Sequence, residues 1–166
     1  MNPTGIESAT GSEPLVAWTL RRAILIVFCL ATTGVFVELL LLGHFEDLAQ
    51  WLPLALLALG LVNLGWYASA RSAASLRVFQ LLTLLFVASG ALGLYLHYQG
   101  NVEFELEMHP EMKGLRLIWG ALTGATPALA PGTMIQLGLL GFAYTFQHPR
   151  LLRAPLPPIT PEGTPR

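Results

Sequence analysis

Carboxylates and histidines are the side chains of this sequence that are best suited to chemistry. One carboxylate, Glu38, interrupts a long apolar run. A charged side chain near the bilayer centre costs about 2.5–3.5 kcal/mol on insertion scales, so Glu38 marks either a function or a buried hydrogen-bond partner. Gln136 is expected at a similar depth in a later apolar run, where a Glu38–Gln136 hydrogen bond is geometrically possible. Asn63 is expected to tie two helices together by a hydrogen bond.

A second group of candidates combines histidines and acidic residues near the ends of the apolar runs. Carboxylates are ligands for hard cations, whereas histidines suit zinc or copper. The candidate ligands are His44, Glu46, Asp47, His97, Glu103, Glu105, Glu107 and His109. Their spacing matches no metal motif, and a solvated acidic surface accounts for the glutamates equally well. We therefore predict no metal centre and no cofactor, and we find no catalytic motif.

Long apolar segments must position these side chains. The chain has 166 residues, of which 54% are hydrophobic and only 11% charged, whereas soluble domains carry about 25% charged residues. A membrane-spanning helix needs about 20 apolar residues. Four segments qualify or come close, at residues 23–42, 52–70, 78–98 and 131–148. Their small residues predict close helix packing, through Gly60 and Gly65, Ser89 and Gly93, and Gly138 and Gly141.

The arginines predict the orientation of these spans. Seven of the nine basic residues flank the spans on one side, namely Arg21, Arg22, Arg71, Arg77, Arg150, Arg153 and Arg166. The positive-inside rule then predicts that both termini are cytoplasmic. We therefore expect an integral membrane protein of the bacterial inner membrane. The single cysteine, Cys29, excludes an intrachain disulfide and a cysteine zinc site.

The segment between the third and fourth spans, residues 99–130, is too long for a minimal turn. Apolar and polar residues alternate from Val102 to His109, which predicts an extended segment with its glutamates on one face. The apolar and basic residues that follow Pro110 predict a short helix in the membrane interface.

The predicted fold class is therefore an all-α membrane protein. It is a four-transmembrane-helix bundle over residues 21–149, with a short extended segment and an interfacial helix on its outer side. Residues 1–20 and 150–166 are expected to be disordered tails, because they are polar or rich in proline and glycine.

Three functions agree with this layout. We expect a noncatalytic accessory or assembly subunit, or interaction module, which binds other membrane proteins or copies of itself within the lipid bilayer. The first alternative is a proton- or cation-coupled transporter or channel component that uses Glu38. The second is a metal- or quinone-handling membrane enzyme that uses the outer histidines. A net charge of −1 gives no reason to expect nucleic acid as a partner.

Overall fold

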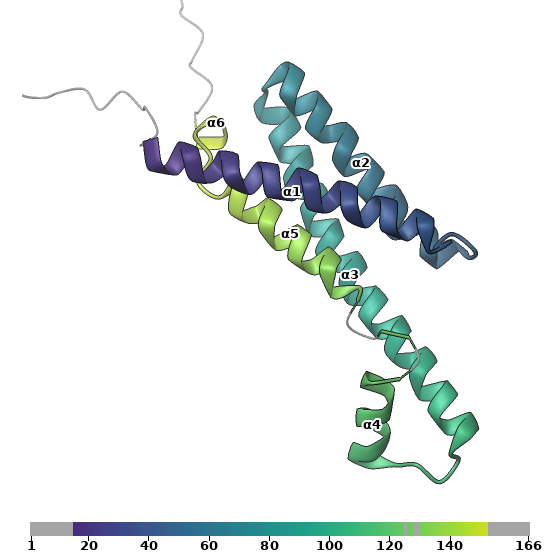
Figure 1. Cartoon of the computed structure of the whole chain (residues 1–166). Coiled ribbons are helices and arrows are strands. Elements are labelled where there is room, and N and C mark those ends of the chain that lie inside the picture. Colours follow the sequence, from purple (N-terminus) through teal and green to yellow (C-terminus); the bar gives the residue numbers. More distant parts are fainter. Residues whose placement is uncertain (1–14, 125, 128–129, 153–166) are drawn as a thin grey trace, which may run out of the picture.

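The computed structural model describes residues 15–124, 126–127 and 130–152, and within these ranges all regular structure is helical. Six helices follow one another along the chain (Figure 1): α1 (Leu15–Leu41), α2 (Leu48–Ala70), α3 (Ala73–Met108), α4 (Gly114–Leu122), α5 (Gly132–Thr145) and α6 (Pro149–Leu152). The all-α prediction is therefore confirmed. Most of the two expected tails lies outside the described residues, but residues 15–20 and 150–152, assigned to those tails, are helical.

Three helices are long and apolar enough to cross a membrane: α1, α2 and α3. They contain the first three predicted spans, which supports an integral membrane protein. The fourth predicted span, 131–148, is helical only as α5, whose 14 residues fall short of the roughly 20 that a perpendicular crossing needs. The helix ends at Thr145 with Phe146 as its C-cap, and Gln147 then adopts a positive φ of 48° before α6 begins.

Side-chain caps fix the starts of α2 and α3. The Asp47 carboxylate accepts a hydrogen bond from the Gln50 backbone N–H at 2.9 Å, and the Ser72 hydroxyl accepts one from the Ser75 N–H at 3.1 Å. Each bond satisfies one of the amide groups that a helix start leaves without a partner. The two caps therefore hold the short turns that connect α1 to α2 and α2 to α3.

The extended segment predicted for residues 102–109 is wrong, because α3 continues as one helix to Met108. An isolated strand would leave its backbone N–H and C=O groups unpaired, whereas a helix satisfies them internally. The alternating pattern is then distributed around the helix, and Phe104, Leu106 and Met108 become exposed. The face that carries Asn101 and Glu105 packs instead against α4.

Helix α3 is the centre of the molecule, because α2, α4 and α5 all pack on it, while α1 packs on α2 and α5. The core between these helices is aromatic. Phe28 of α1 meets Phe79 of α3 edge to face, with ring centroids 5.0 Å apart, and all three of Phe28, Phe79 and Phe86 are buried.

Glycines allow α5 to approach α3 closely. A Cβ atom on Gly138 would lie 2.6 Å from the Thr83 carbonyl oxygen, and one on Gly90 would lie 2.9 Å from the Pro131 carbonyl oxygen. Both neighbours are backbone atoms, which cannot move aside cheaply. The glycines predicted to pack do so at Gly138, Gly141, Gly93 and Gly60, whereas Gly65 has no neighbour within 4 Å.

We expect Gly138→Ala to destabilise the protein by about 1–3 kcal/mol, because overpacking forces α5 away from the α3 backbone. Unfolding by sodium dodecyl sulfate, followed by tryptophan fluorescence, measures this change. The control is Gly65→Ala, which adds the same methyl group into open space and should leave stability equal or slightly higher. Equal effects of the two substitutions would disprove the close α3–α5 contact.

Candidate functional site

The two ends of the helical bundle differ in their side chains. At one end, called here the arginine end, Arg21 donates to the Tyr144 carbonyl at 2.6 Å and Arg150 donates to the Arg71 carbonyl at 2.6 Å. The other end, called the histidine end, contains the α1–α2 turn with His44 and the stretch of α3 around His97. Beyond it, α3 and α4 form a helical hairpin that stands away from the other helices (Figure 1).

A cavity of about 620 Å³ opens at the histidine end. Its walls come from the end of α1, the α1–α2 turn, the start of α2, α3 from Ser89 to Phe104, and residues 126–127 and 130–134. Most of the lining is apolar. Its polar residues are Glu38, His44, Asp47, Gln50, Ser89, His97, Asn101, Thr126 and Thr133.

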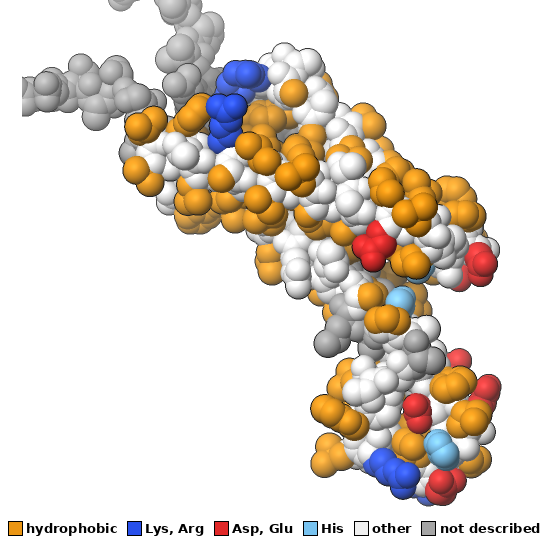
Figure 2. Space-filling model, viewed as in Figure 1, with side chains coloured by type: hydrophobic (Ala, Val, Ile, Leu, Met, Phe, Trp, Pro, Cys, Tyr) orange, Lys and Arg blue, Asp and Glu red, His pale blue; other side chains and the backbone are white. Residues whose placement is uncertain are grey.

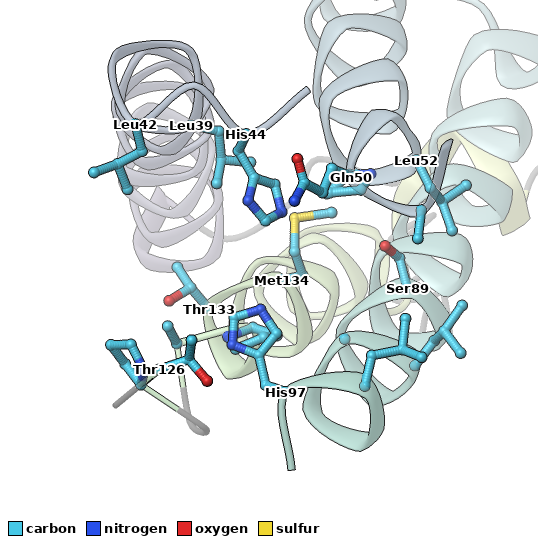
Figure 3. A pocket seen from close by; sticks show the side chains of 18 of the residues that line it. Leu39, Leu42, His44, Gln50, Leu52, Ser89, His97, Thr126, Thr133 and Met134 are labelled. Atoms are coloured by element: carbon cyan, nitrogen blue, oxygen red, sulfur yellow. The ribbon is translucent and has the colours of Figure 1, made fainter. Parts of the chain in front are cut away.

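Two histidines face each other across this cavity (Figure 3). The rings of His44 and His97 have centroids 6.5 Å apart and are tilted by 46°. Burial and the neighbouring His97 lower the pKa of His44, and the Asp47 carboxylate partly offsets them. The His97 Nδ1 atom is buried and has no hydrogen-bond partner. Buried polar atoms nearly always have a hydrogen-bond partner, so His97 Nδ1 is an exception in the wall of this cavity.

The predicted site residues divide into two groups. Glu38, His44, Asp47 and His97 line the cavity, whereas Glu103, Glu105 and Glu107 belong to the part of α3 in the hairpin, and His109 is the residue that follows the end of α3. His109 Nδ1 lies 3.9 Å from a carboxylate oxygen of Glu111, and Glu46 is exposed in the α1–α2 turn. Within the described ranges no three His, Cys, Asp or Glu side chains are close enough together to hold a metal ion.

The polar residues within the predicted spans have different environments. Glu38 and Gln136 are both exposed, and of the two only Glu38 lines the cavity. No hydrogen bond joins these two described side chains. Asn63 is buried, and its side-chain amide donates to the Ser75 carbonyl at 3.3 Å, which links α2 to α3. Depth in the membrane alone therefore did not distinguish a helix-linking residue from an exposed one.

Asn101 is the structural residue that the sequence interpretation missed. Its amide nitrogen donates to the carbonyls of Ala121 at 2.8 Å and Thr126 at 2.7 Å. Its amide oxygen accepts from the backbone N–H and the hydroxyl of Thr126. The Gly100-Asn101 pair is a turn signal in the sequence, and no local pattern predicts bonds to residues 20 and 25 positions further along the chain.

The arginine end holds a second cluster that sequence reasoning did not identify. The Tyr144 hydroxyl donates to the Tyr67 hydroxyl at 2.9 Å, and the latter lies 3.4 Å from His148 Nε2. These residues come from the end of α2, the end of α5 and the turn between α5 and α6, so only the folded packing of the helices brings them together. The cluster therefore joins the ends of α2 and α5 at the arginine end.

The hairpin carries an exposed apolar surface of its own. On α4, Leu115 and Trp119 are 83% and 69% exposed, and Met108 at the end of α3 is also exposed. Charged side chains gather on the same lobe, in contrast to the largely apolar helical body (Figure 2).

Comparison with protein-family models, curated proteins and solved structures gives no match for this chain.

We expect Asp47→Asn to lower the pKa of His44 further, because it removes the negative charge that favours the imidazolium form. Asparagine preserves the cap of α2, since it accepts the same backbone hydrogen bond. Titration of the imidazole ¹⁵N signals by NMR measures the shift, with His109 as an internal reference. An unchanged or higher pKa of His44 would contradict the described contact.

The sign of the linked pH dependence follows from this lowered pKa. Because the folded protein holds a His44 pKa below the ordinary value of about 6.5, the unfolded chain binds more protons between these two values. His44 therefore contributes stability above pH 6.5 that is lost as the pH falls towards its folded-state pKa.

Proposed function

We propose that the protein is a noncatalytic accessory or assembly subunit that docks another membrane protein through the α3–α4 hairpin. The observation that carries this proposal is the projection of the hairpin away from the helical bundle. At 1.5 Å per residue, the 36 residues of α3 extend about 54 Å, which exceeds a hydrocarbon core of about 30 Å. The far third of α3 thus reaches beyond the lipid chains.

Hydrogen bonds and buried contacts within the hairpin pre-organise its surface for binding. Asn101 clamps the linker between α4 and α5, and Met112 and Ala121 are buried at the α3–α4 contact. A pre-organised surface loses little conformational entropy on binding. Leu115 and Trp119 supply the apolar contact area, and an exposed tryptophan is a frequent centre of binding energy in interfaces.

Charge indicates what kind of surface the partner presents. Glu103, Glu105, Glu107 and Glu111 outnumber Lys113 and Arg116 on the hairpin. Complementary charge raises association rates and disfavours wrong partners. The partner is therefore a membrane subunit with an apolar patch bordered by basic residues.

The same proposal includes four membrane crossings, with both termini in the cytoplasm of a bacterial cell. Gly93 contacts Pro131 at the start of α5, and Arg150 bonds to the α2–α3 turn. The chain from Pro131 to Arg150 therefore covers the same depth as α3 from Gly93 to its start, about 30 Å at 1.5 Å per residue. This geometry supports a crossing by α5 together with the residues up to α6, and the arginines at that end support a cytoplasmic orientation.

We expect the double variant Leu115→Ser with Trp119→Ser to lose its stoichiometric partner on purification from native membranes in mild detergent. A photo-crosslinking residue at position 115 should attach to that same partner, identified by mass spectrometry. The matched control is Leu30→Ser with Leu59→Ser, two apolar side chains exposed on α1 and α2, which should retain the partner. Purification of the unmodified protein as a free monomer would contradict docking. Crosslinks only to a second copy of this chain would show that the hairpin mediates self-assembly and does not dock a different subunit.

We expect single cysteines at Ser12 and Thr164 to resist a membrane-impermeant maleimide in intact cells, because both tails are proposed to be cytoplasmic. A cysteine at Glu107, which is exposed on the hairpin, should react. The background is Cys29→Ser, and permeabilised cells provide the positive control. Reaction at Thr164→Cys but not at Ser12→Cys would show three crossings instead of four.

The cavity favours a second candidate function, a proton- or cation-coupled transporter component. Glu38 lines the cavity together with His44 and His97, so a titratable carboxylate adjoins this open cavity. Unaltered flux of the transported ion after Glu38→Gln would remove this candidate.

A further inference from the structure

We propose that the cavity at the histidine end binds an uncharged, lipid-soluble molecule with a flat head bearing carbonyl or hydroxyl oxygens, of the quinone or quinol type. The head lies between His44 and His97, and the apolar tail leaves towards the lipid chains. This site is separate from the hairpin surface and does not depend on the docking proposal.

The size and lining of the cavity fit such a molecule. Its volume of about 620 Å³ lies within the roughly 300–1,000 Å³ typical of small-molecule sites. The apolar part of the wall includes Val35, Leu39, Leu92 and Met134. Leu42 and Leu96 also line it and are 72% and 42% exposed, so an apolar tail can continue from the cavity along them.

The two imidazoles provide the contact for the polar head. His97 Nδ1 is the only side-chain atom of the lining that is buried without a hydrogen-bond partner among the described residues. An imidazole nitrogen serves as donor or acceptor according to its tautomer, so it can bond to a carbonyl or to a hydroxyl. The lowered pKa of His44 keeps that ring largely neutral at pH 7, so it too offers one donor and one acceptor.

The charges around the cavity disfavour an anionic amphiphile, and its small number of aromatic rings disfavours a quaternary ammonium head. Among the residues that the structure describes, no lysine or arginine lines it, while Glu38 and Asp47 do, which disfavours the anionic phosphate of a lipid headgroup. Quaternary ammonium groups are recognised by aromatic faces, and Phe104 is the one such ring in the lining besides the histidines. A cationic head would also leave the His97 Nδ1 atom without a partner if that nitrogen carries the proton.

The test is equilibrium binding to the full chain in nanodiscs, with three probes that share a decyl tail: a decyl-substituted benzoquinone, decyl phosphate and decyltrimethylammonium. We expect saturable binding of the benzoquinone with a perturbed His97 imidazole ¹⁵N signal. The other two probes should bind at least about tenfold more weakly. Equal or tighter binding of the ammonium probe would overturn the proposal in favour of a cation site at Glu38, and tighter binding of the phosphate probe would also overturn it.

Two histidine variants locate the site. His97→Phe should weaken benzoquinone binding about five- to tenfold, the effect of one lost hydrogen bond. His97→Gln, whose amide still hydrogen-bonds, should recover part of it. The matched control is His109→Phe on the hairpin, whose side chain is 51% exposed, and it should bind as the unmodified protein does. Melting curves without ligand establish that each variant is folded, and equal affinities for His97→Phe and the unmodified protein would refute the site.

Discussion

The side-chain amide of Asn101 fixes the parts of this molecule on which its proposed functions depend. A buried amide is tolerated only when its donors and acceptors are bonded, and Asn101 uses two of each. Ala121, at the end of α4, and Thr126, in the cavity wall, are both held to α3 by this one side chain. The hairpin and the cavity wall therefore both depend on the hydrogen bonds of this one side chain. Gly124 leaves space for the Asn101 amide, because a Cβ at this position would lie 2.9 Å from Asn101 Cγ.

Much of the fold follows from composition, because hydrophobicity and length need no knowledge of partners. The first three apolar runs predict α1, α2 and α3 closely in their interiors, and the error lies at the ends. The strand expected from Val102 to His109 failed for a physical reason. Alternation shows which side chains share a face of a strand, but it does not show whether a second strand exists to pair with it. Without that partner, the helix already begun at Ala73 continues.

The candidate site was predictable only in part, because membrane depth follows from residue spacing but the direction of a side chain does not. His44 and His97 were expected near the ends of the apolar runs, and the two rings do face each other. Glu38 and Gln136 share a level, yet both are exposed on the helix surfaces. The cavity itself has no signature in the sequence, because its wall combines the end of α1, the middle of α3 and the chain before α5.

Because α3 is one continuous helix from Ala73 to Met108, its hairpin end and the part that carries His97 move together. Gly90 and Gly93 form its contact with the start of α5 that lies nearest to the hairpin, where Pro131 and Ile135 leave no room for a Cβ, so this contact is the natural pivot. At 1.5 Å per residue, Met108 lies about 22 Å beyond Gly93, whereas His97 lies only about 6 Å beyond it. A sideways displacement of about 4 Å at the hairpin tip therefore moves His97 by about 1 Å relative to His44, which belongs to a different segment. A force on the hairpin thus changes the distance between the His44 and His97 rings. The ratio of the two displacements is set by the number of residues along α3 between the pivot and each point.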